Sequence, residues 1–128
     1  MDQRKALKSA GLALLLVLVT LPPAAGTSEG EASVLARKVL DSTTLEWSQA
    51  FSARGSAYRA PKVMFNRLPR LHPARGAGYS PGELVTLDLG ELEETRAIFP
   101  RDGNALAALM IAHEVAHHVQ FLEMREGR

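Results

Sequence analysis

The chain has 128 residues, a net charge of +1 and no cysteine. Its length allows one small domain, and a charge this close to zero, without a clustered basic face, gives no argument for nucleic acid or an acidic partner. Without cysteine there are no disulfides and no lipid-modified cysteine anchor.

The first 26 residues have the composition of a secretory signal. Arg4, Lys5 and Lys8 precede the apolar run GLALLLVLVTL, and PPAAGTSEG then brings helix breakers and small residues. This order is typical of a signal peptide that is cleaved near 24–26. The apolar run is shorter than the roughly 20 residues that span a bilayer, so a retained membrane anchor is the less favoured alternative. Either way, we expect the chain to be exported to the periplasm or the extracellular space.

Two helices are predicted after this segment. Apolar residues have near-helical spacing in residues 28–41 and again in residues 43–55. Thr43 and Glu46 have the spacing of a capping box at the start of the second helix, and Gly55 is a good helix stop. We therefore expect two separate helices at the start of the domain.

Two strands and two further helices follow. The strands are separated by a loop, residues 66–82, that is rich in proline and glycine. Asp102 or Asn104 would cap the last helix. Helices followed by two strands and more helices indicate an α+β domain over residues 27–128. The elements predicted here are the strands 61–65 and 83–89, the short helix 90–100 and the long helix of about 104–125.

The long helix contains the sequence HEVAH at residues 113–117. Positions i and i+4 of a helix lie on one face, so His113 and His117 can place two imidazoles on one zinc ion. Glu114 points about 100° away from His113 and can act as general base on a zinc-bound water. A shuffled chain of this composition contains the pattern in about 1 case in 100. The alternative is that these three residues are ordinary polar side chains of a helix.

The segment IAHEVAHHVQ resembles the helix of the bacterial neutral zinc metallopeptidase family. GAGYSPGELVTLDL, residues 76–89, is similar to a second family segment, in which G-P-F-Y-C-P is followed by a strand that ends in aspartate. The similarity covers about residues 38–121. It implies a zincin-like α+β fold, Zn²⁺ as cofactor and a polypeptide substrate. The family's upstream series is also present, as Trp47, Phe51, Gly55, Tyr58 and the strand from Pro61.

Three departures from the family pattern stand out. Ala116 occupies the usual glycine position, and Ser80 replaces a cysteine. The family also continues into a helix with an E-x-x-A-D stretch, whose glutamate is its expected third zinc ligand. Nothing in residues 118–128 offers that ligand, because Glu123 cannot fold back from the same helix and Glu126 is more distal. The resemblance thus implies a domain truncated at its C-terminus and, as written, poorly active or inactive.

Residues elsewhere in the chain offer ligand groups but are not assigned as zinc ligands. His72 lies in the loop, and Glu83 and Asp88 flank the second strand, where Asp88 is better explained as a turn or cap residue. His118 faces away from the histidine pair and is more typical of a packing or surface histidine than of a ligand.

The leading hypothesis is a zinc peptidase in which His113 and His117 bind the metal, Glu114 is the base, and an edge strand holds an extended peptide. The alternative is a non-catalytic exported binding module or degenerate pseudo-peptidase. A third possibility is that another chain supplies the missing ligand. The sequence does not indicate an oligomeric state. Apolar residues of the last helix, such as Leu109 and Val119, must be covered by the few elements present.

Overall fold

The computed structural model describes residues 30–127, so the signal or anchor predicted for residues 1–26 lies outside the described part. Within residues 30–127 there are three helices and a three-stranded sheet, which confirms the α+β class. In residues 30–127, no helix is long and apolar enough to cross a membrane. The elements are α2 (Glu31–Ala53), β1 (Lys62–Asn66), β2 (Gly78–Ser80), β3 (Leu84–Asp88), α3 (Leu89–Ile98) and α4 (Gly103–Arg125).

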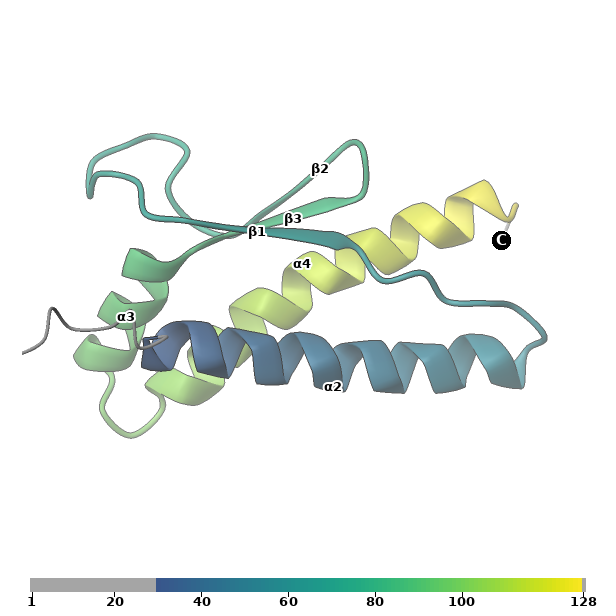
Figure 1. Cartoon of the computed structure of the whole chain (residues 1–128), viewed down its shortest axis with the longest axis horizontal. Helices are drawn as coiled ribbons and strands as arrows, with labels where there is room; N and C mark the ends of the chain where they lie inside the picture. The colour runs from purple at the N-terminus through teal and green to yellow at the C-terminus, as the bar shows by residue number, and fades with distance from the viewer. Residues whose placement is uncertain (1–29, 128) are drawn as a thin grey trace, which may run out of the picture.

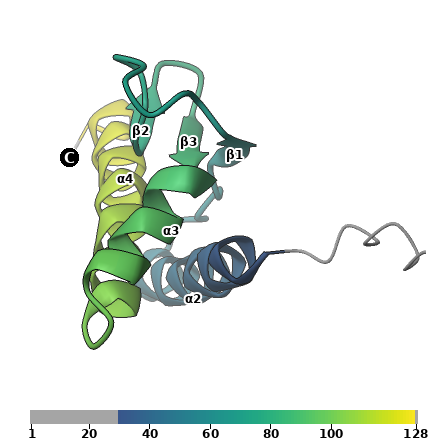
Figure 2. The same cartoon turned by 90° about the vertical axis from the view of Figure 1, so that its left-hand side faces the viewer.

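The sheet has the strand order β1-β3-β2, with β1 parallel and β2 antiparallel to the central β3. Helices α2 and α4 lie together on one side of the sheet, and α3 lies at one end (Figure 1). The end view shows that β2 is the strand beside α4, whereas β1 lies on the side toward α2 (Figure 2). Helix α4 therefore contacts the other two helices and the sheet, and it is the element around which the domain is built.

The first helix corrects one prediction. Residues 31–53 form one continuous helix instead of two. Thr43 does not cap a second helix, because its hydroxyl donates to the Leu40 carbonyl oxygen, 2.9 Å away, in the preceding turn. No glycine or proline interrupts the segment, and its packing along α4 favours a single straight element. The predicted stop is confirmed: the helix ends at Ala53, and Gly55 has a φ of +78°.

The sheet corrects a second prediction. Gly78–Ser80, expected in a loop, forms a third strand in which Tyr79 pairs with Val85. Three residues are too few to show an alternating pattern, so local periodicity could not find this strand. The strand follows Gly76, whose φ of +127° is strained for other residues, and the turn at Gly82 returns the chain to β3.

The core consists of two groups of buried residues that share α4. The apolar stripe of α4 faces α2, α3 and the sheet, so the opposite side of the helix faces solvent. This burial fixes which of its histidines are exposed. The first group is Ala32, Ala36, Val85, Leu87, Leu92, Ala107 and Ile111, and the second is Phe51, Val119 and Leu122.

The start of α4 also differs from prediction. Asp102 occupies the N-cap position but its side chain makes no capping hydrogen bond. Asn104 lies inside the helix, where its side-chain oxygen accepts from Arg96 Nε at 2.6 Å. Gly103 packs so closely on α3 that a Cβ atom would lie 2.5 Å from Arg96 Cα. Close packing, rather than a side-chain cap, therefore sets this helix start.

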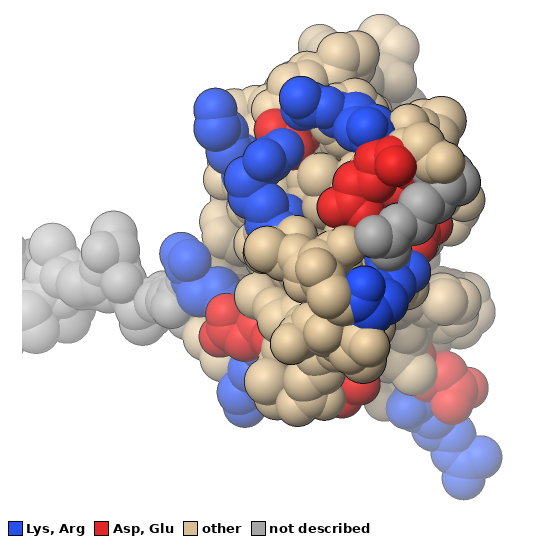
Figure 3. All heavy atoms as spheres, turned by 90° about the vertical axis from the view of Figure 1, so that its right-hand side faces the viewer, with Lys and Arg blue, Asp and Glu red and all other residues tan. Residues whose placement is uncertain are grey.

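Surface charge is mixed. On the end of the molecule shown in Figure 3, basic and acidic side chains are interspersed around uncharged ones. Arg54 of α2 and Glu123 of α4, for example, form an ion pair of 2.9 Å. This face therefore has no single-sign patch of the kind that binds nucleic acid.

Candidate metal and peptide site

Helix α4 brings His113 and His117 together on its exposed side. Their Nε2 atoms are 3.1 Å apart. Two nitrogens bound to one tetrahedral zinc at about 2.0–2.1 Å would lie about 3.3–3.4 Å apart. The contact is a hydrogen bond in which one Nε2 carries the proton, and its length is close to the separation that a shared zinc ion would give.

Gln120, one turn further along α4, orients His117. Its side-chain oxygen lies 3.3 Å from His117 Nδ1. Because an amide oxygen only accepts hydrogen bonds, the proton belongs on Nδ1, and the lone pair is on Nε2. This is the tautomer that a metal ligand needs, and such outer contacts commonly fix the ring of a ligating histidine.

Glu114 lies on a different side of the helix from the two histidines. Its side chain is buried, with 9% of the residue exposed. Together with His113 it lines a groove of about 530 Å³ between α4, the start of α3 and the loop before β2. The carboxylate thus lies in a space that a substrate could enter beside the histidine pair. The other lining residues are Arg75, Gly76, Ala77, Glu91, Leu109 and Met110.

The described part of the chain does not add a third ligand to the pair. Among residues 30–127, no three histidine or acidic side chains are close enough to hold one metal ion. His72 is an exposed loop residue whose Nδ1 accepts from Ala74 N at 3.1 Å. Glu83 forms an ion pair with Arg59. His72 and Glu83 therefore interact with neighbouring residues and do not join the histidine pair.

Asp88 is a structural residue, as expected for the end of a strand. Its buried carboxylate accepts from Leu68 N at 2.7 Å and from Glu91 N at 2.9 Å, and Arg75 Nε lies 3.5 Å away. Burial alone would raise the pKa of Asp88, but the two backbone hydrogen bonds and Arg75 outweigh it and lower the pKa below its ordinary value. Asp88 therefore joins the end of β3, the start of α3 and the loop that walls the groove.

His118 is a packing residue, which decides between the packing and surface roles that the sequence left open. It is fully buried, and its Nε2 lies 2.6 Å from the Arg59 carbonyl oxygen. Since that oxygen can only accept, Nε2 carries the proton, and Nδ1 accepts from the Tyr79 hydroxyl at 3.1 Å. Burial, followed by the charge of Glu83, raises the pKa of Tyr79 and keeps this hydroxyl protonated. The pair attaches β2 to α4, a link between residues 39 positions apart that no local spacing indicates.

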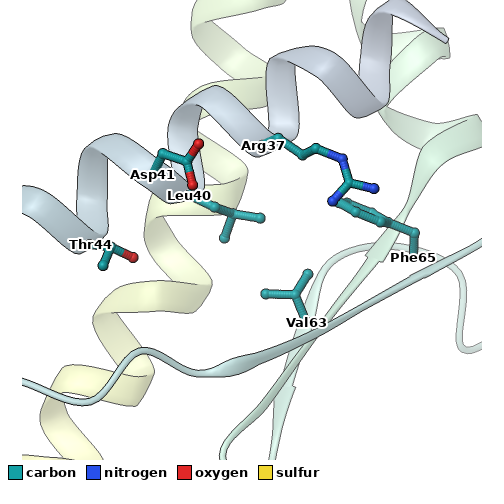
Figure 4. Close-up of a pocket in the computed structure, with 6 residues that line it drawn as sticks. All are labelled: Arg37, Leu40, Asp41, Thr44, Val63 and Phe65. Atoms are coloured by element: carbon teal, nitrogen blue, oxygen red, sulfur yellow. The ribbon is translucent and has the colours of Figure 1, made fainter. Parts of the chain in front are cut away.

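A second cavity, of about 600 Å³, lies between α2 and β1. Leu40 of α2 faces Val63 and Phe65 of β1 across it, and the Arg37 guanidinium lies 5.1 Å from the centre of the Phe65 ring (Figure 4). Its lining contains no histidine and one carboxylate, from Asp41. This cavity is larger than the groove but lacks the donor atoms of a metal or hydrolytic site.

Comparison with known proteins agrees with the resemblance in sequence. The family described as "Putative neutral zinc metallopeptidase" matches residues 20–124. Two curated relatives, both called uncharacterized protein YpfJ, come from Escherichia coli K12 and E. coli O6:H1 strain CFT073. Each is 32% identical over 102 residues, which cover 74% of this chain and 36% of the relative. The chain thus spans about a third of the length of these relatives. No solved structure matches it.

Proposed function

The chain belongs to the neutral zinc metallopeptidase family, and from this premise we propose that it provides the zinc-binding helix and catalytic base of a peptidase acting on exported polypeptides. The observation that carries the proposal is the convergence of His113 Nε2 and His117 Nε2 at 3.1 Å, with Glu114 in the adjoining groove. The proposed location outside the cytoplasm is supported by the signal-like composition of residues 1–26.

Each residue has a distinct role in this proposal. The lone pairs of His113 and His117 would hold the metal, and Gln120 would keep His117 in the correct tautomer. When bound, zinc polarises the scissile carbonyl and lowers the pKa of water. Glu114 would take a proton from the attacking water and deliver it to the leaving amine. Its place in the groove, away from the Nε2 pair, suits a base better than a third ligand.

The substrate would lie along α4 next to β2. β2 is an edge strand of the sheet, and the loop that leads into it forms one wall of the groove. An extended peptide added to this edge would pass Glu114 with its backbone paired to the strand. The Tyr79–His118 hydrogen bond would keep the edge at a constant position relative to the metal helix.

A catalytic zinc site has three protein ligands as a rule. Residues 30–127 provide two, so the proposal requires a donor from outside this part of the polypeptide. Another chain is one source. In that case zinc would bind tightly only to an oligomer or a complex, which size-exclusion chromatography with metal analysis would show.

Metal content and hydrolysis should be measured in matched variants. We expect Glu114→Gln to keep the zinc content of the wild type and lose peptide hydrolysis by at least about 100-fold. His117→Ala should lose both. His72→Ala is the control, since this exposed loop histidine does not line the groove and its ring accepts from Ala74 N. Equal hydrolysis by the wild type and Glu114→Gln, at equal zinc content, would reject the catalytic proposal.

A non-catalytic binding module is the second candidate. It is favoured by the two-ligand site in residues 30–127 and by the edge strand β2. This candidate predicts peptide binding without zinc and without cleavage. Peptide binding that is unchanged by a chelator and by His117→Ala would favour it over the peptidase.

A further inference from the structure

Glu91 is a second acidic residue in the groove that contains Glu114. It lies in the first turn of α3, and its backbone N–H donates to Asp88. Its side-chain Oε2 atom is buried and, within residues 30–127, has no hydrogen-bond partner. A buried acceptor of this kind costs free energy, and a ligand that donates a hydrogen bond recovers that cost.

The arginine of the groove lining already has carboxylate partners. Arg75 lines the same groove, but its guanidinium lies 3.5 Å from Asp88 and 3.1 Å from Glu94. Glu94 also lies 3.8 Å from Arg70 Nε, and Arg75 is held mainly by groups outside the groove lining. The lining itself contains two carboxylates, those of Glu91 and Glu114, and one arginine. A cation that enters the groove therefore meets an excess of carboxylates.

The loop before β2 leaves room for this carboxylate. The φ of Gly76 is +127°, which favours glycine, and a Cβ atom there would lie 2.8 Å from Glu91 Oε2, so a larger residue would displace this carboxylate. Opposite the acidic groups, Leu109 and Met110 of α4 give the groove an apolar wall. Leu109 is 66% exposed. A long aliphatic stem with a terminal cation matches this combination of an apolar wall and a carboxylate.

We propose that Glu91 selects a cationic group of the substrate, an ammonium or guanidinium held in the groove beside His113 and Glu114. The inference rests on the proposed peptidase function for the identity of the ligand as a peptide. It adds a residue that determines specificity. The cation can come from a lysine or arginine side chain or from a free N-terminus, and experiment separates these two sources.

Binding should be measured in the full chain carrying Glu114→Gln, which removes the proposed base and so prevents hydrolysis. The probes are fluorescent alanine-rich peptides, acetylated and amidated, with one central lysine, arginine, norleucine or glutamate. We expect lysine or arginine to bind about tenfold tighter than norleucine, because one partner of the new hydrogen bond is charged. A norleucine peptide with a free N-terminus tests the other source, and a similar gain there assigns the cation to the terminus.

Two variants of α3 complete the design. Adding Glu91→Gln to the Glu114→Gln protein keeps the shape of the side chain and removes its charge. This double variant should lose the preference for a cation. Adding Glu93→Gln should leave it, because Glu93 pairs with Arg67 away from the groove. Equal affinity for all probes, or a preference that persists in Glu91→Gln, overturns the proposal. The comparison of lysine with norleucine needs no change at Glu91, so it decides the question even if that variant does not fold.

Failure of this inference is distinguishable from failure of the proposed function. A cation preference that depends on Glu91, in a wild-type protein that cleaves no peptide, would leave the groove assignment standing and reject the peptidase. Hydrolysis that depends on zinc and Glu114, with no discrimination between lysine and norleucine, would support the peptidase and reject the role of Glu91 in selecting a cation.

Discussion

Replacement of Asp88 by asparagine should destabilise the whole domain, although the two side chains have nearly the same size. Asp88 accepts from Leu68 N at 2.7 Å and from Glu91 N at 2.9 Å, with no exposed side-chain surface. Asparagine has one accepting oxygen, so one of these N–H groups would face an NH₂ group instead. The oxygen of asparagine can still accept from one of the two N–H groups, and loss of the charged acceptor at the other costs about 1.5 to 3 kcal/mol. The expected loss of unfolding free energy is therefore about 1.5 to 3 kcal/mol.

Urea unfolding followed by circular dichroism measures this loss directly. In a thermal scan, a change of this size lowers the Tm of a domain of roughly 100 residues by at least about 6 °C. Glu93→Gln on the same helix is the control, because its ion pair with Arg67 is largely exposed and should contribute far less. A variant at Asp88 that is as stable as the control would show that these hydrogen bonds do not hold the loop.

The same substitution has a pH signature. The pKa of Asp88 is lower in the folded protein than its ordinary value of 3.8. The stability that the ionised carboxylate contributes is thus fully present above that value and is lost as the pH falls toward the folded-state pKa. We expect the difference between wild type and Asp88→Asn to be constant near pH 7 and to shrink below about pH 4. A difference that stays the same in acid would contradict an electrostatic role.

Three further predictions concern α4. Gly103→Ala should lower the Tm, because a Cβ atom would lie 2.5 Å from Arg96 Cα and force α3 and α4 apart. The expected cost is about 1–3 kcal/mol. An unchanged melting curve would mean that α3 can move away without cost. Tyr79→Phe should cost about 1 kcal/mol in urea unfolding, since it leaves His118 Nδ1 without its donor, and a neutral result would assign this bond no net worth. His117→Ala should alter the metal-free unfolding free energy by less than about 0.5 kcal/mol, because the residue is exposed. It should nevertheless remove any rise in Tm that zinc causes in the wild type, and an equal rise in the variant would place zinc elsewhere.

Local spacing was enough to predict several parts of this protein. The helix that carries His113 and His117 has the right residues within each turn, and one turn of a helix is itself sufficient to bring the two imidazoles together. Gly55 as a helix stop and Asp88 as a cap were predictable for the same reason, since Gly55 follows directly on the helix that it ends and the capping bond of Asp88 is to Glu91, three positions on. The two longer strands and both later helices also follow from their own periodicity.

The differences from prediction in α2 and β2 involve contacts between elements. The sequence around Thr43 contains an adequate capping box, yet packing of α2 along α4 outweighs it and the helix continues. Strand β2 pairs with β3 six positions along the chain, through Tyr79 and Val85, and it is attached to α4 by the bond from Tyr79 to His118, 39 positions away.

The groove shows the same division most clearly. The pattern at residues 113–117 predicts a pair of ligands and a base, because a helix places them by its own geometry. It says nothing of Gly76 and Glu91, which reach the same groove from a loop and from another helix. Those residues meet only because burial of the apolar stripe of α4 fixes how the loop and α3 pack around it. The proposed zinc ligands and base were therefore predictable from one turn of helix, whereas the surroundings that would select a substrate were decided by the tertiary fold.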